Sequence, residues 1–168
     1  MLKENLMQVL KEMEEVTKFF KLEPFDIYLL GGSACIIGEY TTRATMDIDF
    51  IDLGYPAKYG KVFSILRDYD MLEYESTLLS PNYKKRATKL EEFNFINVYI
   101  LSKEDIIASK IIRLENKDIE DIKEMIDNCN KDILNEVINE IVQRDDLFES
   151  KKKEFMKKLK MFKEKFNV

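Results

Sequence analysis

The stretch from residue 25 to residue 50 constrains the fold more than any other part of the chain. An apolar run at 25–30 ends at two glycines and a serine, and a short helical segment later the chain reads MDIDF at 46–50. Side chains of a strand alternate between its two faces, so Asp47 and Asp49 point to one side while their apolar neighbours face the core. This pattern predicts two neighbouring strands, the second of which carries paired carboxylates.

The paired carboxylates indicate a metal site. Two acids on one strand face repel each other, and oxygen ligands of this kind suit Mg²⁺, which commonly also holds substrate phosphates. The alternative is an exposed strand face with two solvated acids. Gly31 and Gly32 favour the metal, because glycine lets the backbone approach a ligand closely and a helix that begins there presents free N–H groups to an anion. With the Ser33 hydroxyl, these features indicate a nucleotide–Mg²⁺ site.

The hydrophobic spacing along the chain predicts an α+β protein. Helices are expected at 2–21, 33–40, 57–69, 103–114, 117–128, 131–143 and 146–166, and strands at 25–30, 45–52, 71–76, 86–92 and 95–101, with a loop at 77–85. Ser102 followed by Asp105 is a capping-box pattern. We expect an α/β core with an N-terminal helix at 1–101 and a helical region at 102–168 that packs on it.

Composition narrows the chemistry. The 168 residues include no histidine, which excludes Ser-His-Asp and Cys-His catalysis and most zinc sites. The chain shows no apolar run of the ~20 residues that span a bilayer and no export signal, so we expect a cytoplasmic protein without membrane contact. Its two cysteines, Cys35 and Cys129, are then expected to be reduced thiols.

Residues 29–50, LLGGSACIIGEYTTRATMDIDF, resemble the signature of the nucleotidyltransferase superfamily with the DNA-polymerase-β-like fold. The Thr42-Arg43 and Thr45 positions match the Arg-x-Thr-x-Asp-x-Asp form, which is typical of bacterial abortive-infection toxin-type nucleotidyltransferases and related uncharacterised families. Residues 98–122, VYILSKEDIIASKIIRLENKDIEDI, are also similar to that branch.

The resemblance implies a mixed β-sheet flanked by helices and Mg²⁺-dependent transfer of a nucleoside monophosphate from an NTP to an acceptor hydroxyl. The acceptor would be an RNA 3′ end such as that of tRNA, a protein or a small molecule, and a toxin-like member would have an antitoxin-like partner. The implied catalytic residues are Asp47, Asp49, Lys110 and Asp118, of which Asp47 and Asp49 hold the metal; the implied nucleotide-binding residues are Gly31, Gly32, Ser33, Thr42, Arg43 and Thr45.

Charged residues of the second motif have either a structural role or a role in the nucleotide site. Lys110 falls within the apolar sector of its helix, where it either snorkels to the rim or points into the nucleotide site. In both cases its replacement by methionine is expected to keep or raise stability. Asp118 either stabilises a helix N-terminus or serves the site, and Asp121 is expected to be solvated.

A third carboxylate, the base for the attacking hydroxyl in transferring members, has no clear counterpart. The strand expected at 86–92 offers Glu91, and Glu73 or Glu75 are further candidates. The alternative function is therefore a catalytically degenerate module that binds a nucleotide or a partner. The basic stretch at 82–86 either contacts a polyanion or is a solvated loop.

The C-terminal segment is basic, whereas the rest of the chain is acidic. Residues 151–168 hold eight lysines and two glutamates, so the other 150 residues carry a net charge of −11. Helical spacing from 147 to 166 places an aromatic row on one side, and most lysines lie off that side; the row is Phe148, Phe155, Leu159, Phe162 and Phe166. The lysines either offset the acidic body or attract an RNA acceptor.

Overall fold

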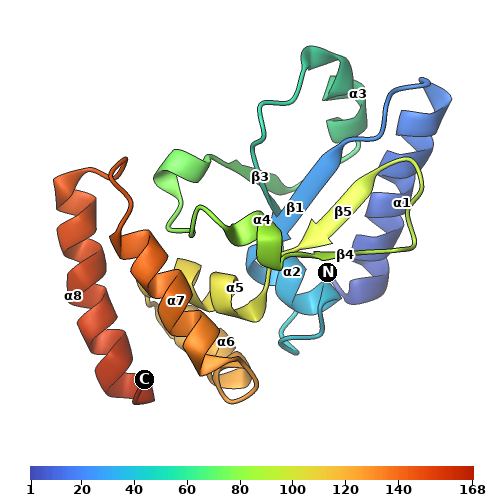
Figure 1. Ribbon diagram of the computed structural model, residues 1–168. Coiled ribbons are helices and arrows are strands. Elements are labelled where there is room, and N and C mark those ends of the chain that lie inside the picture. Colours follow the sequence, from blue (N-terminus) through green and yellow to red (C-terminus); the bar gives the residue numbers. More distant parts are fainter. The chain divides into compact units, whose positions relative to one another are not determined.

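The computed structural model describes all 168 residues and divides into two compact units (Figure 1). The first unit comprises Met1–Glu73 and Ala87–Leu101, and the second comprises Tyr74–Arg86 and Ser102–Val168. Leu101 and Ser102 belong to different units, and segment 74–86 belongs with the C-terminal helices. None of the helices is both long enough and apolar enough to cross a membrane.

The first unit is built on a five-stranded mixed sheet in the order β3-β2-β1-β5-β4. The strands are β1 (Asp26–Leu30), β2 (Ile48–Ile51), β3 (Tyr69–Leu72), β4 (Thr88–Lys89) and β5 (Asn97–Ile100). The central β1 pairs in parallel with β5 and antiparallel with β2, while β2 and β3 are parallel and β4 and β5 antiparallel. This arrangement confirms the expected α+β class with a mixed sheet.

Three helices belong to this unit: α1 (Lys3–Phe19), α2 (Gly31–Ile37) and α3 (Gly60–Phe63), the last preceded by a 3₁₀ turn at Ala57–Tyr59. Period-2 alternation puts Leu29, Phe50 and Val98 on one face of the sheet, where all three are buried. On that face the Phe50 ring stacks on Phe63 with centroids 5.4 Å apart. On the opposite face, Tyr28 of β1 stacks on Tyr99 of β5 at 4.6 Å.

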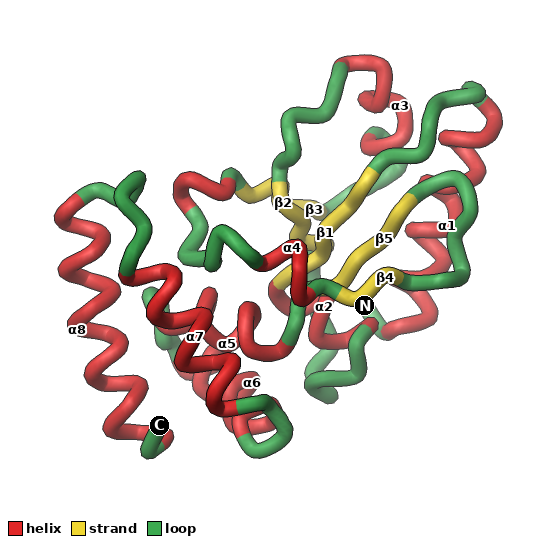
Figure 2. Tube along the Cα trace, viewed as in Figure 1, coloured by secondary structure: helices red, strands yellow, loops and turns green.

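The second unit is helical (Figure 2). Its elements are a 3₁₀ turn at Tyr74–Ser76, α4 (Tyr83–Arg86), α5 (Lys103–Ile111), α6 (Asn116–Ile126), α7 (Lys131–Val142) and α8 (Glu149–Phe166). Helix α5 contacts α6, α7 and α8, and its apolar side chains Ile107 and Ile111 are fully buried. The expected cap of α5 is confirmed, because the Asp105 N–H donates to Ser102 Oγ at 3.1 Å.

Two arginines tie segment 74–86 to the helices of its own unit. Arg86 forms a bidentate ion pair with the buried Asp105 of α5, through Nε at 2.8 Å and Nη2 at 3.0 Å. Arg144, only 4% exposed, donates to the carbonyl oxygens of Thr77 and Leu79. The basic stretch at 82–86 is therefore partly structural, and it forms α4 where a loop was expected.

The largest differences from the expected elements lie between residues 57 and 92. The helix expected at 57–69 is limited to a 3₁₀ turn and the four residues of α3, because the chain from Tyr69 pairs with β2 instead. The strand expected at 86–92 shrinks to the two residues of β4 at the sheet edge. In the first of these places, pairing with β2 overrides the local helical pattern.

Candidate nucleotide and metal site

The turn that links β1 to α2 is joined to β2 by one buried serine. Ser33 is fully buried, and its hydroxyl donates to the Leu30 carbonyl at 3.0 Å and accepts from the Asp49 N–H at 3.2 Å. The serine predicted to bind nucleotide thus fixes the backbone of the predicted metal-binding strand against the start of α2. This contact joins the Gly-Gly-Ser turn directly to the Asp-x-Asp strand.

Both glycines of the turn face side chains of the 45–49 segment. Gly31 has a φ of +61°, a conformation that L side chains rarely adopt, and a Cβ there would overlap Asp49 Oδ2. A Cβ on Gly32 would come to 2.7 Å from Thr45 Oγ1. The Asp49 carboxylate therefore lies directly against the Gly31 backbone, and the Thr45 hydroxyl lies against Gly32.

The remaining residues of the first motif surround this contact. Thr45 is buried, and its hydroxyl donates to the Asp47 carbonyl at 3.0 Å, which shapes the chain just before β2. Asp47 is the residue immediately before the strand and Asp49 is its second residue; both are partly exposed. Thr42 and Arg43 are exposed in the preceding segment.

Strand β3 supplies a carboxylate that the sequence reading missed. Asp70 pairs in register with Asp49 across the parallel strands β2 and β3. Parallel neighbours in register point to the same face of a sheet, and adjacent strands lie about 4.8 Å apart. Asp70 is exposed and thus accessible beside Asp49. The signal was present in the sequence, because residues 68–71, DYDM, repeat the alternation of residues 47–50, DIDF.

The sheet order removes one of the three acids first considered for this role. Glu91 follows β4, which is separated from β2 by both β1 and β5. Glu75 lies in the second unit. Glu73 follows β3 directly, one residue beyond its end, and is exposed. Glu91 therefore does not lie beside the Asp-x-Asp strand, whose neighbours in the sheet are β1 and β3.

The protein alone does not provide a complete set of metal ligands. No three acidic or cysteine side chains come close enough together to hold an ion. Mg²⁺ is usually bound through one or two carboxylates, with substrate phosphates and water completing its octahedron. Asp47 and Asp49 therefore fit an ion that arrives with a triphosphate.

Lys110 and Asp118 lie in the second unit, where they form a buried ionic cluster. The Lys110 ammonium lies 3.2 Å from Asp121 Oδ2 and 3.6 Å from Asp118 Oδ1. Arg113 donates to Asp118 through Nε at 2.7 Å and through Nη2, and the Glu115 N–H donates at 3.0 Å. Burial opposes ionisation of Asp118, but these hydrogen bonds and the nearby positive charges lower its pKa below the ordinary value.

The cluster corrects two expectations. Asp121 is 1% exposed and pairs with Lys110, whereas it was expected to be solvated. Lys110 does not snorkel to the rim, because its side chain is only 7% exposed. A helical pattern showed that Lys110 sits among apolar residues, but it could not show that α6 places two carboxylates opposite it.

Two cavities contain none of the predicted site residues in their linings. A cavity of about 860 Å³ in the second unit is lined mainly by polar side chains of α7 and by Tyr74, Asn82 and Arg144. A smaller one of about 320 Å³ in the first unit borders Met46 and Ile48. Ile48 faces the side of the sheet opposite to Asp49, so neither cavity is the metal site.

Comparison with known proteins supports the interpretation of the first motif. No curated protein and no solved structure matches the chain. A family model does match, over residues 4–167, and its description is "Nucleotidyltransferase of unknown function (DUF6036)". The match covers both units, from α1 to the end of α8. The chain therefore belongs to this nucleotidyltransferase family.

Proposed function

We propose that the protein transfers a nucleoside monophosphate from an NTP to an acceptor hydroxyl in a Mg²⁺-dependent reaction. The observation that carries the proposal is the position of Asp49, which lies against the Gly31 backbone and in register with Asp70. Three segments of one unit thus bring Gly31, Asp49 and Asp70 together, and we assign them phosphate binding, metal binding and the role of base. Membership of a nucleotidyltransferase family supports an NTP as substrate.

In the proposed mechanism the protein binds and orients the NTP and removes the proton from the attacking hydroxyl. Asp47 and Asp49 hold the ion, which neutralises charge on the triphosphate. The backbone N–H groups of Gly31 and Gly32 and the exposed Arg43 bind phosphate oxygens.

Asp70 accepts the proton of the acceptor's hydroxyl group while the oxygen of that hydroxyl bonds to the α-phosphorus of the NTP. The bond between that phosphorus and the bridging oxygen breaks, and pyrophosphate leaves.

Lys110 and Asp118 have a structural role in the proposal. The resemblance implies that Lys110 contacts phosphate, but in this chain its ammonium is paired with two carboxylates. Removing one member of a buried ion pair leaves an uncompensated charge, so the pair keeps α5 and α6 in fixed positions. We therefore assign these two residues to the stability of the second unit.

Transfer of label identifies the reaction. The protein is incubated with Mg²⁺ and each NTP, labelled at either the α- or the γ-phosphate, together with total tRNA, cell protein or a small-molecule extract. We expect α-label, and no γ-label, to appear on one acceptor class, and chelation by EDTA to abolish it. Label transfer from the γ-phosphate, or transfer that EDTA leaves intact, would show that the assigned reaction is wrong.

The non-catalytic alternative has its own signature. A degenerate module binds Mg²⁺·NTP without transferring label to any acceptor. Binding of this kind raises the free energy of unfolding by ~2.7 kcal/mol at a hundredfold excess over Kd. Asp70 favours the enzyme, because it supplies the third carboxylate for which the sequence showed no clear candidate. The toxin role and the antitoxin-like partner follow from the resemblance, and growth arrest on expression tests them.

A further inference from the structure

Helix α8 turns one side inward and leaves a basic side exposed. The aromatic row expected from the sequence is confirmed at its centre, where Phe155, Leu159 and Phe162 are buried within the second unit. Two lysines of α8 bond to the rest of the unit, Lys151 to the Ser76 carbonyl and Lys158 to the Arg113 carbonyl. Five others are exposed and form no ion pair: Lys153, Lys157, Lys160, Lys163 and Lys165.

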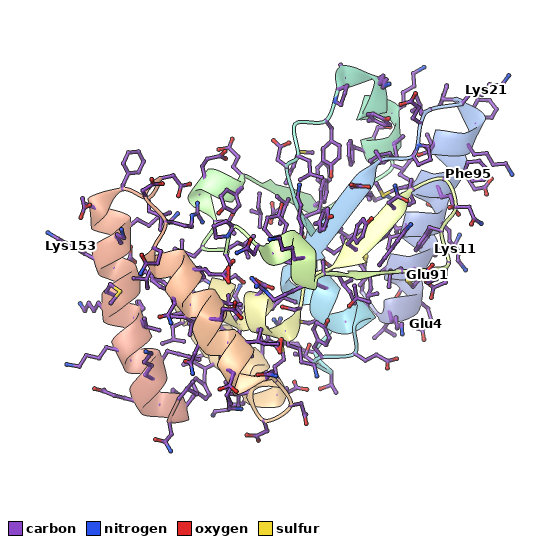
Figure 3. The ribbon with its side chains drawn as sticks, viewed as in Figure 1. Glu4, Lys11, Lys21, Glu91, Phe95 and Lys153 are labelled. Carbon is purple, nitrogen blue, oxygen red and sulfur yellow. The ribbon has the colours of Figure 1, made fainter.

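Three of the exposed lysines form a row along the helix. Lys153, Lys157 and Lys160 follow one another at i, i+4 and i+7, which places them within about 60° on one face. Figure 3 shows the labelled Lys153 extending outward from α8, on the side away from α7. At 1.5 Å per residue the row spans about 10 Å. A nucleic acid strand carries several phosphates over that length.

An exposed aromatic ring stands at the N-terminal end of the same helix. Phe148 was expected to continue the buried row, but it is the N-cap residue of α8 and is 82% exposed. It stacks on no other ring and on no cation. The chain leaves the helical path at this residue, so its side chain departs from the direction that helical spacing predicts.

We propose that the outer face of α8, together with Phe148, binds single-stranded RNA. The lysine row contacts successive phosphates and the Phe148 ring stacks on a base, which is the combination that single-strand-binding surfaces use. The binding surface is independent of catalysis. The further statement that this RNA is the acceptor of the transferred nucleotide rests on the proposed function.

The composition of the face favours RNA over an anionic membrane. A membrane-binding amphipathic helix needs an apolar side to insert between lipids. The apolar side of α8 is already buried within the second unit, and the exposed lysines share their surface only with Met156 and Met161 as large apolar residues. The lysines can therefore contact a polyanion, but α8 has no free apolar side to insert into a membrane.

Charge reversal with a matched control tests the lysine row. The K153E/K157E/K160E variant is compared with K11E/K117E/K123E, which changes the net charge equally at exposed lysines of α1 and α6. Binding to a fluorescent 20-nucleotide single-stranded RNA is followed by anisotropy over a range of salt concentrations. We expect the α8 variant to bind at least tenfold more weakly and the slope of log K against log salt to fall in magnitude by ~2, at ~0.7 per phosphate contact.

Phe148→Ala tests base stacking, with Phe19→Ala as control because Phe19 is 77% exposed at the end of α1. We expect Phe148→Ala to weaken RNA binding roughly five- to tenfold without changing the salt slope, since stacking releases no counterions. Circular dichroism should show that all four variants are folded, because every altered side chain is exposed.

The proposal is overturned if the parent shows no salt-sensitive RNA binding, or if both charge-reversed variants lose equal affinity. It is also overturned if the α8 row binds vesicles with 30% phosphatidylserine but not RNA. Asp49→Asn separates the two proposals. If that variant retains RNA binding and the parent transfers no label, the surface stands and the transferase assignment falls.

Discussion

Asp49 and Asp70 are in-register neighbours on the parallel strands β2 and β3, and they point to the same face of the sheet. The Ile48 N–H donates to the Asp68 carbonyl at 3.1 Å, so the residue just before β3 also bonds to the start of β2. Two Asp-x-Asp segments therefore run side by side. One of them touches the Gly31 backbone through Asp49 and the other is exposed.

Replacing the first pair of acids tests metal binding. We expect Asp47→Asn and Asp49→Asn each to abolish Mg²⁺-dependent NTP binding, measured by thermal shift and calorimetry, and to leave the apo protein at least as stable as the parent. The physical reason is that each substitution removes one of two repelling carboxylates and one ligand. A double Asn variant that binds Mg²⁺·NTP as tightly as the parent would exclude this metal site.

Asp70→Asn separates transfer from binding. If Asp70 is the base, the variant binds Mg²⁺·NTP with nearly the parent affinity but transfers label 10²- to 10⁴-fold more slowly, the range typical of general-base removal. Asp68→Asn is the matched control, because Asp68 is exposed two residues earlier and outside the strand. Equal rates of label transfer for Asp70→Asn and the parent would exclude Asp70 as the base and would leave Glu73 as the candidate.

Gly31→Ala tests the close contact with Asp49. An alanine at a φ of +61° costs about 1–2 kcal/mol, and its Cβ displaces the Asp49 carboxylate. We expect loss of both stability and Mg²⁺·NTP binding. Gly60→Ala is the control, since a Cβ there meets nothing within 4 Å and Gly60 has helical dihedral angles. It should be neutral or slightly stabilising in urea unfolding.

Lys110→Met is now expected to destabilise the protein, contrary to what the sequence indicated. The substitution removes the ammonium that faces Asp118 and Asp121, and breaking a buried pair from one side costs about 3 kcal/mol. Lys117→Met, at an exposed position of α6, should be nearly neutral in the same urea titration. A stable Lys110→Met variant with weakened NTP affinity would instead assign Lys110 to phosphate binding.

The lowered pKa of Asp118 predicts a loss of stability in acid. Its folded-state pKa lies below the unfolded value of about 3.9, so the stabilisation is complete above that value and disappears as the pH falls through the folded-state pKa. We expect Asp118→Asn to be less stable than the parent at pH 7 and the gap in unfolding free energy to narrow below pH 4. A gap that stays constant down to pH 3 would contradict this linkage.

Much of the fold could be predicted from the sequence because it depends on local patterns. The apolar run before Gly31 predicted β1, helical spacing predicted α5 to α8, and Ser102 predicted the cap of α5. The first half of the candidate site could also be foreseen, since Gly31 and Asp49 lie on segments joined by a short helix. Such features follow from alternation, spacing and caps, each of which is written within a few residues.

Local patterns were enough to predict the residue types of the site and the face on which each strand presents them. Long-range packing settles which strand lies beside β2, which carboxylates pair with Lys110 and where the buried aromatic row of α8 ends. Alternation along a strand assigns a side chain to one face of the sheet. Its neighbour on the adjacent strand depends on the pairing of segments that are distant in the sequence. Asp70 therefore repeats a visible motif, yet only the register of β3 on β2 places it next to Asp49.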